Sequence, residues 1–397
     1  MSLGNRARTL RAVLRTGGVA GIFRRLRKSG RMRWHRWRGR RLSQKRGWRT
    51  KQPVLVIEAD DWGAEHMSGP DASREMKRAG LAGVDACYSF DGLERPEDVD
   101  RLCEVLSAHR DADGTPAVMT VNFVVANPDY AVIEACGYEG FHSRPIDRGW
   151  NHEADSAGLW RSYRRAMDCG VFVPQLHGYL HFDPDEWLGR LREGDPATLK
   201  AFELRMIGEM EDADGVGIES MAPIYYGTAQ ETQRFVVKGL EVFERAFGRD
   251  SLTTIAPCYA WRSPETEEIL LTHGIRCMQG KEFQYLPGGV PKLHYVGERG
   301  DSGMLYLTRT CLLEPIASGT TVEQCVTEIV NAFSLDLPAI LCSHRINYTS
   351  RVAAHVRDKG LAVLDGVLKQ VTSRFPNVEF LSSDQLASRI MEQTSSS

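Results

Sequence analysis

The sequence has no long hydrophobic run. No stretch of its 397 residues reaches the roughly 18 uninterrupted apolar residues that suggest a membrane-spanning helix. Hydrophobic residues make up 42% of the chain and charged residues 26%, which is ordinary for a globular protein. The chain also has no internal repeat, and no low-complexity linker separates a second domain. These absences exclude an integral membrane protein and predict one main folded unit.

The sequence also has no CxxC pair. Its nine cysteines are an odd number and are scattered along the chain. The N-terminus does not resemble a secretory signal, because its best apolar stretch, GGVAGIF at 17–23, is short, rich in glycine and followed at once by RRLRK. We therefore expect a reducing compartment, and interpret the protein as cytoplasmic.

Acidic residues are missing from the first 51 positions. These positions hold 18 of the 50 Lys and Arg, which leaves 32 basic against 52 acidic residues in the remainder. A basic arm on an acidic body should seek an anionic surface. That surface could be phospholipid, nucleic acid, or the phosphates of a lipid-linked or nucleotide-linked substrate.

The pattern within the arm favours a membrane surface. Apolar residues at 10, 13, 14, 19, 22, 23 and 26 follow helical spacing, and Trp34 and Trp37 stand among arginines in RMRWHRWRGRRL. Such a helix suits the headgroup region of an anionic membrane. The alternatives are a disordered solubilising tail and, less favoured, a nucleic-acid-binding arm. We expect residues 1–52 to form a basic extension and the protein to associate peripherally with the inner face of the membrane.

From residue 53 to 397 the chain alternates short β-rich runs with amphipathic helical stretches, as expected of a parallel sheet or a βα barrel. The candidate strands are 54–59, 116–125, 171–178, 251–257, 303–310 and 338–344. The candidate helices are 96–109, 156–169, 197–211, 231–247, 264–273, 321–334 and 352–374. Two longer irregular stretches, 137–155 and 182–230, are candidate substrate-shaping loops.

Polar residues recur where these strands end, and in parallel βα architectures those ends converge on one face. They are Asp60 and Asp61, His177 with His181, Tyr259 and His344. Each has a structural alternative when taken alone. An Asp pair is often a turn or a helix cap, an HxxxH pair a surface detail, and a single histidine a packed one.

Taken together, these residues fit a metal site. The spacing of His177 and His181 suits two nitrogen ligands, and one carboxylate of the Asp doublet would complete a three-ligand site with a position left for water. Because side chains alternate along a strand, we expect the doublet to lie past the end of strand 54–59. One carboxylate could then bind the metal while its neighbour takes a proton.

The ordered set EADDWG, VNFVV, HGYLH, IAPCYAW and ILCSH resembles the motifs of the polysaccharide deacetylase family, also called the NodB-homology or carbohydrate esterase 4 family. The resemblance covers most of residues 53–387. It implies a distorted (β/α) barrel of about seven strands. It also implies a hydrolase in which a divalent metal, usually zinc, binds the water that removes acetyl from an N-acetylated sugar.

The resemblance also implies roles for the site residues. Those roles are catalytic base for Asp60, metal ligand for Asp61, His177 and His181, general acid for His344, and a backbone N–H toward the oxyanion for Tyr259. The third motif has Ala256 where the family has an Arg that orients the base. Arg309 is our candidate for its replacement, and Arg262 is the alternative.

Other departures leave the substrate open. The fourth motif, which supplies an acidic partner and an aromatic wall, has no clear match, and EADDWG differs from the usual Thr-Phe-Asp-Asp-Gly. These differences suggest a divergent member of the family. The basic arm and the missing export signal lead us to expect a lipid-linked or nucleotide-linked glycan precursor as its substrate. The alternatives are a hydrolase of another amide or ester, and an inactive glycan-binding protein of the same fold.

Overall fold

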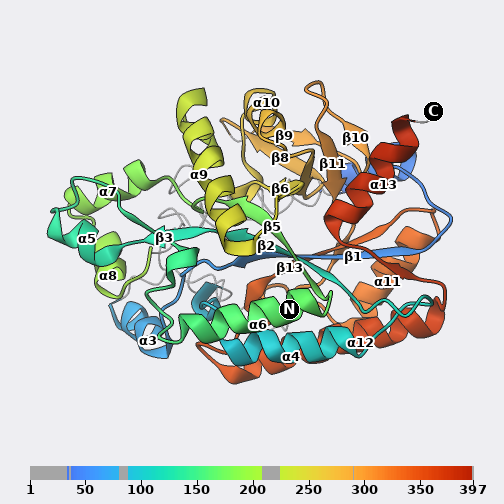
Figure 1. Ribbon diagram of the computed structural model, residues 1–397, viewed down its shortest axis with the longest axis horizontal. Coiled ribbons are helices and arrows are strands. Elements are labelled where there is room, and N and C mark those ends of the chain that lie inside the picture. The colour runs from blue at the N-terminus through green and yellow to red at the C-terminus, as the bar shows by residue number, and fades with distance from the viewer. Residues whose placement is uncertain (1–33, 35–36, 80–87, 208–223, 289, 396–397) are drawn as a thin grey trace, which may run out of the picture.

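The computed structural model describes residues 34, 37–79, 88–207, 224–288 and 290–395 (Figure 1). Its core is a ten-stranded sheet in which only the pair β10–β11 is antiparallel. The strands of this sheet are β1 Val54–Trp62, β2 Met119–Val124, β5 Phe172–Gly178, β6 Thr253–Ile255, β7 Cys277–Gly280, β10 Glu298–Arg299, β11 Leu305–Thr308, β12 Cys311–Leu312, β13 Ala339–His344 and β14 Glu379–Phe380. The expected α/β class is confirmed.

The two ends of the parallel part of this sheet are adjacent in the chain. The strand order is β11-β7-β6-β5-β2-β1-β13-β12, and only Arg309 and Thr310 separate β11 from β12. The Arg309 N–H donates to Gly280 at the end of β7 at 2.8 Å, whereas the Thr310 N–H donates to Ile340 in β13 at 3.0 Å. The hydrogen-bonded ladder stays open here, but the chain itself joins both sides. The arrangement agrees with the expected distorted barrel of about seven strands.

Helices cover the outside of the sheet. Figure 1 shows α4, α6 and α12 side by side below it, and α9, α10 and α13 above it. The bounds of the helices are α3 Pro70–Arg78, α4 Pro96–Ser107, α5 Tyr130–Ala135, α6 Ser156–Asp168, α7 Pro184–Arg192, α8 Pro196–Glu203, α9 Ala229–Phe247, α10 Glu265–Thr272, α11 Val322–Phe333, α12 Ala354–Arg374 and α13 Ser383–Ser395.

Local sequence explains why α9 forms where it does. Thr228 caps its first turn and forms a capping box with Glu231, and Gly248 ends it in a left-handed conformation. Val236 and Phe243 lie on one face of the helix and are fully buried. The helix thereby covers the sheet with one apolar stripe.

The six predicted strands correspond to β1, β2, β5, β6, β11 and β13. The two predicted loop regions contain regular structure in their described parts. The first holds β4 Ser143–Pro145, which pairs with β3 Ala126–Pro128, and the second holds α7 and α8. A further hairpin joins β8 Phe283–Leu286 to β9 Val290–Leu293.

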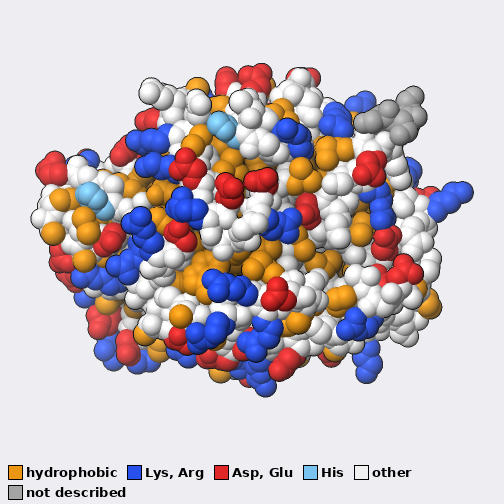
Figure 2. Space-filling view, in the orientation of Figure 1, with side chains coloured by type: hydrophobic (Ala, Val, Ile, Leu, Met, Phe, Trp, Pro, Cys, Tyr) orange, Lys and Arg blue, Asp and Glu red, His pale blue; other side chains and the backbone are white. Residues whose placement is uncertain are grey.

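The apolar pattern at 10–26 lies outside the described residues. Residues 37–46 are helical and are followed by a segment that leads into β1. Among the described helices, none has the length and hydropathy needed to cross a membrane. Figure 2 shows acidic and basic side chains interspersed over the face in view.

Candidate active site

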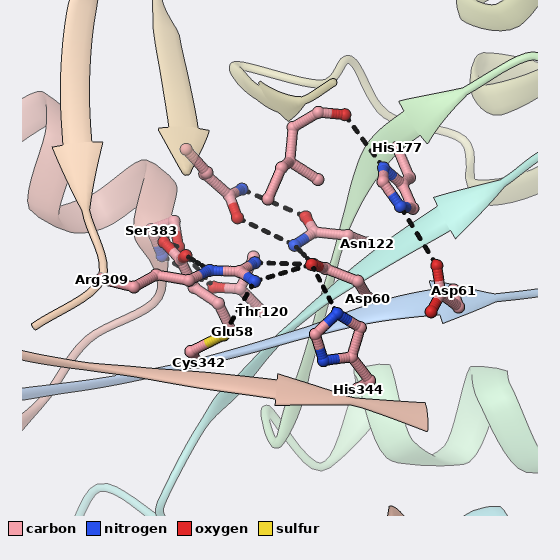
Figure 3. Close-up of polar contacts among 12 residues, drawn as sticks. Glu58, Asp60, Asp61, Thr120, Asn122, His177, Arg309, Cys342, His344 and Ser383 are labelled. Carbon is pink, nitrogen blue, oxygen red and sulfur yellow. Dashed lines mark hydrogen bonds and ion pairs between the residues drawn. The ribbon is translucent and has the colours of Figure 1, made fainter. Parts of the chain in front are cut away.

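The Asp doublet lies within β1 and not after it, so the expectation that the strand ends before residue 60 is wrong. The β1–β2 register shifts between Ala59 and Trp62, and Asp61 has a φ of 71°. A register shift and a left-handed residue both interrupt the alternation of side chains along a strand. Two neighbouring carboxylates can therefore serve one site from different directions, with Asp60 toward Arg309 and Asp61 toward His177 (Figure 3).

Asp61, His177 and His181 lie close together. The Nε2 atoms of both imidazoles are 3.3 Å from Asp61 Oδ1, and the candidate ligand atoms of the three residues all lie within 4.8 Å of one another. Burial opposes the charge on Asp61, but hydrogen bonding to the two histidines holds its pKa well below the usual range. A carboxylate and two imidazole nitrogens are a donor set suited to zinc.

The tautomer of His177 supports a cation at this position. Its Nδ1 lies 2.9 Å from the carbonyl oxygen of Ile255, which can only accept a hydrogen bond. In a neutral imidazole this leaves Nε2 as an acceptor facing the carboxylate of Asp61. Two acceptors at 3.3 Å attract each other only if a proton or a metal ion lies between them. The three residues therefore fit the metal that their spacing predicted.

A glycine between the histidines brings His181 back toward Asp61. Gly178 has a φ of 150°, and a Cβ there would lie 3.2 Å from the carbonyl oxygen of Leu180. A side chain at this position would strain the turn that follows β5. Burial lowers the pKa of His181, which keeps its imidazole neutral and able to donate a lone pair.

Asp60 is held by Arg309, which is located between β11 and β12. The guanidinium donates to Oδ1 and Oδ2 of Asp60, each at 2.6 Å, and to Glu58 at 2.7 Å (Figure 3). Burial alone would raise the pKa of Asp60, but the charge of Arg309 lowers it to about 2. Arg262 instead donates to the carbonyls of residues 226 and 227. Of the two candidate arginines it is therefore Arg309 that contacts Asp60, and its role in orienting a base stays a prediction.

His344 ends β13 beside Asp60, with its Nε2 3.7 Å from Asp60 Oδ2. Its Nδ1 lies 2.5 Å from Glu314, and Asn347 donates to the other oxygen of Glu314 at 2.8 Å. Burial would lower the pKa of His344, but the charge of Glu314 raises it to about 10. His344 is therefore an imidazolium at neutral pH and has a proton to donate.

Tyr259 lies at the same end of the barrel, in a strained turn. Tyr259 and Cys258 both have a positive φ, of 57° and 58°. The Tyr259 N–H donates to the carbonyl of Ala256 at 3.0 Å, and the Tyr259 hydroxyl accepts from Arg309 at 3.3 Å. Its amide is thus engaged within the turn, and its predicted role toward an oxyanion stays a prediction.

A pocket of about 130 Å³ opens beside Asp61 and His344. Its wall combines ionisable and apolar side chains. The remaining lining residues are Asp91, Lys281, Leu312, Glu314, Ala317, Ser318, Cys342 and Ile346. The volume is small beside the several hundred Å³ of a typical ligand pocket, so it suits one small chemical group.

A chain of side-chain amides supports Asp60 from inside the barrel. Asn122 donates to Asp60 Oδ1 and to Gln279, each at 2.8 Å, and Gln279 donates to Thr253 at 2.8 Å. All four residues are buried. Because each polar atom in such a network has a fixed partner, the orientation of the Asp60 carboxylate is fixed as well.

Sequence reasoning missed Glu314 and Asn122. Glu314 follows β12 and therefore carried the same strand-end signal as the predicted residues. It was hidden because β12 is too short to show a periodic pattern. Asn122 lies inside the predicted strand 116–125, where one polar residue in an apolar run was a usable but weak signal.

No protein family model and no curated protein sequence matches the chain. Similar solved structures include Puue allantoinase, at 13% identity and a TM-score of 0.43, covering 87% of this chain and 93% of that one. A CE4 family pseudoenzyme from Bacillus anthracis is 10% identical with a TM-score of 0.39, covering 86% and 67%. The peptidoglycan deacetylase PdaC from Bacillus subtilis is 8% identical with a TM-score of 0.34, covering 87% and 94%.

In the order of its motifs the chain resembles the polysaccharide deacetylase family, and solved members of that family are among the structures to which it is similar.

Proposed function

We propose that the protein is a metal-dependent hydrolase that removes acetyl from an N-acetylated sugar of a glycan or glycan precursor. The observation that carries this proposal is that three groups with different chemical roles lie next to one another, two of them lining the pocket. Asp61 belongs to the donor set, Asp60 is an ionised carboxylate, and His344 is a protonated imidazole 3.7 Å from it. Amide hydrolysis needs a proton acceptor for the attacking water and a proton donor for the leaving amine.

Asp61, His177 and His181 would hold a divalent metal, and their donor atoms suit zinc. When bound, such an ion lowers the pKa of water and polarises a carbonyl oxygen. Asp60 accepts the proton of the attacking water, since Arg309 keeps it ionised and oriented. His344 then donates its proton to the nitrogen of the leaving amine, and Glu314 stabilises the imidazolium until that step.

The lining and the size of the pocket suit a small acyl group. Leu312, Ala317 and Ile346 supply apolar surface beside the ionisable residues. A volume of about 130 Å³ suits an acetyl group better than a long acyl chain. To accept a hydrogen bond from the Tyr259 N–H, an oxyanion would have to replace the Ala256 carbonyl oxygen, which accepts from that N–H in the structure.

The composition of the N-terminal arm bears on where in the cell the protein would act. We propose that the enzyme works in the cytoplasm at the inner face of the membrane, on a lipid-linked or nucleotide-linked precursor. The motivation is the 18 basic and no acidic residues at positions 1–51.

Acetate release from short chitooligosaccharides tests the proposal, with acetate release from acetylated xylan and formate release from simple formamides as the competing reactions. We expect release from the N-acetylated oligosaccharide, and loss of it when His344 is replaced by Gln. His109→Gln is the matched control, because His109 pairs with Asp365 away from the pocket. Release only from xylan or formamides would favour another ester or amide. Sugar binding without any release would favour an inactive glycan-binding protein.

A further inference from the structure

Two exposed tryptophans stand out on the described surface. Among large hydrophobic side chains of the described residues, only Trp34, Trp37 and Val132 are strongly exposed, at 51%, 52% and 42%. The two tryptophans lie one turn apart, Trp37 at the start of helix 37–46 and Trp34 in helical conformation before it. An exposed aromatic pair of this kind commonly marks an interaction surface.

The side chains around these tryptophans form one helical face. Helical spacing places Trp34, Trp37, Arg38, Arg41 and Lys45 on the same side, and all five are exposed. We call this set the Trp–Arg face. The guanidinium of Arg38 lies 4.6 Å from the Trp34 ring centre, and Arg41 lies 4.6 Å from that of Trp37. The face therefore combines positive charge with amphipathic aromatic rings.

The opposite side of this helix is fixed to the barrel. Gly39, Ser43 and Gly47 recur every four residues and are buried. A Cβ at Gly39 would lie 2.3 Å from the Cβ of Glu282, so only glycine allows this approach. Arg40 pairs with Glu282 at 3.3 Å and with Glu328 at 2.8 Å. The Trp–Arg face is thus presented by a helix docked on the folded body.

The docked helix begins at the pocket end of the barrel. Glu282 directly follows Lys281, and the Leu312 N–H donates to Glu328 at 2.7 Å. Both Lys281 and Leu312 line the pocket. The far end of the helix lies elsewhere, since a Cβ at Gly47 would contact Leu337, which comes before β13. The end of the helix that carries Trp37 therefore contacts residues that neighbour the pocket lining.

We infer that the Trp–Arg face docks the pocket end of the barrel onto an anionic phospholipid surface. Arginines beside indole rings match the charge of anionic headgroups and the preference of tryptophan for the membrane interface. A guanidinium already covers one side of each ring, which leaves less ring surface for stacking on nucleic-acid bases. The orientation of the pocket matters to catalysis only if the proposed function holds, whereas the docking itself does not depend on it.

Vesicle co-sedimentation of the full chain tests this inference. Wild type should bind vesicles containing phosphatidylserine and bind poorly to phosphatidylcholine alone. The double variant Trp34→Ser, Trp37→Ser should weaken vesicle binding about tenfold. The double variant Arg38→Gln, Arg41→Gln should weaken it roughly fivefold for each charge removed, which is as large an effect or larger. Val132→Ser is the matched control and should bind like wild type. All variants should keep the wild-type melting temperature, because the replaced side chains are exposed.

Brominated lipids supply the second readout. They should quench tryptophan fluorescence in wild type and in Val132→Ser, and should not quench it in the double Trp variant. Unchanged binding by the double Trp variant would overturn the inference. So would wild-type chain that binds RNA or DNA through the same residues in preference to vesicles. Acetate release from a soluble oligosaccharide should be unchanged in these variants, so a failure of docking can be told apart from a failure of the proposed function.

Discussion

Arg309 and Asp60 form a two-point contact, in which the two terminal nitrogens of the guanidinium each donate to one carboxylate oxygen at 2.6 Å. Arg309 can reach Asp60 because the chain crosses from the β7 side of the sheet to the β13 side at this residue. Arg309 lies where the hydrogen-bonded ladder is open, and its guanidinium orients Asp60, the predicted base.

Arg309→Lys should reduce activity and stability together. Lysine keeps the charge but lacks the planar fork that contacts both oxygens, so we expect kcat/KM to fall about a hundredfold, as for other lost orienting contacts. We expect the free energy of unfolding to fall by about 3 kcal/mol, because Glu58 and Asp60 remain buried with a poorer partner. Urea unfolding and acetate release measure the two effects. Arg262→Lys is the control, and equal behaviour of the two variants would contradict the assignment of Arg309.

Acid should remove part of the stability that Asp60 provides. Its pKa is about 2 in the folded protein, and an unfolded aspartate has a pKa of about 3.9. A depressed pKa contributes stability at higher pH, so about 2 kcal/mol should be present above pH ~4 and be lost as the pH falls toward 2. Unfolding measured across this range should show the loss in wild type and a smaller one in Asp60→Asn. If the free energy of unfolding fell with pH at the same slope in both proteins, this would be evidence against a stabilising ion pair between Asp60 and Arg309.

Glu314→Gln should shift the alkaline side of the pH–rate profile. Glu314 raises the pKa of His344 to about 10, so the protonated acid persists through the neutral range and is lost as the pH rises through that value. Without the carboxylate we expect the pKa of His344 to fall, and activity to be lost at a lower pH. NMR titration of the imidazole gives the pKa directly. Asp365→Asn, which changes the partner of His109, should leave His344 unaffected.

Asn122 and Gln279 should act as a pair. Asn122→Leu leaves the Gln279 amide buried without its partner, and we expect a loss of about 2 kcal/mol in the free energy of unfolding. Gln279→Leu should cost a similar amount for the same reason. The double variant should lose clearly less than the sum, because neither amide then remains unpaired. Additive losses would show that the two side chains do not depend on each other.

Much of the fold could be predicted from local sequence. The strands at 54–59, 171–178 and 338–344 have apolar, β-rich runs, and each appears within two or three residues of its predicted position. The strand β7 was missed because Cys277–Gly280 is four residues long and contains Gln279. Its place in the sheet depends on pairing with β6 and β11, which a local pattern does not contain.

Residues of the candidate site were predictable where an ionisable side chain stands at the end of a predicted strand. His177, His181 and His344 met that condition, and the structure brings each of them to the same end of the barrel as the Asp doublet. The β1 register shift was not predictable, because nothing in EADDWG specifies where the pairing with β2 slips. The pairing of His344 with Glu314 was hidden for a related reason, since it joins residues 30 positions apart, one at the end of β13 and the other after β12.

The most direct test of the account is the metal content of the purified protein and of two histidine variants. Wild type should contain close to one equivalent of zinc or a similar divalent ion. His177→Ala and His181→Ala should lose it while keeping the wild-type circular dichroism, and His109→Ala should keep it. Full metal content in the two site variants, or a metal-free wild type that still releases acetate, would contradict the claim that Asp61, His177 and His181 share one ion.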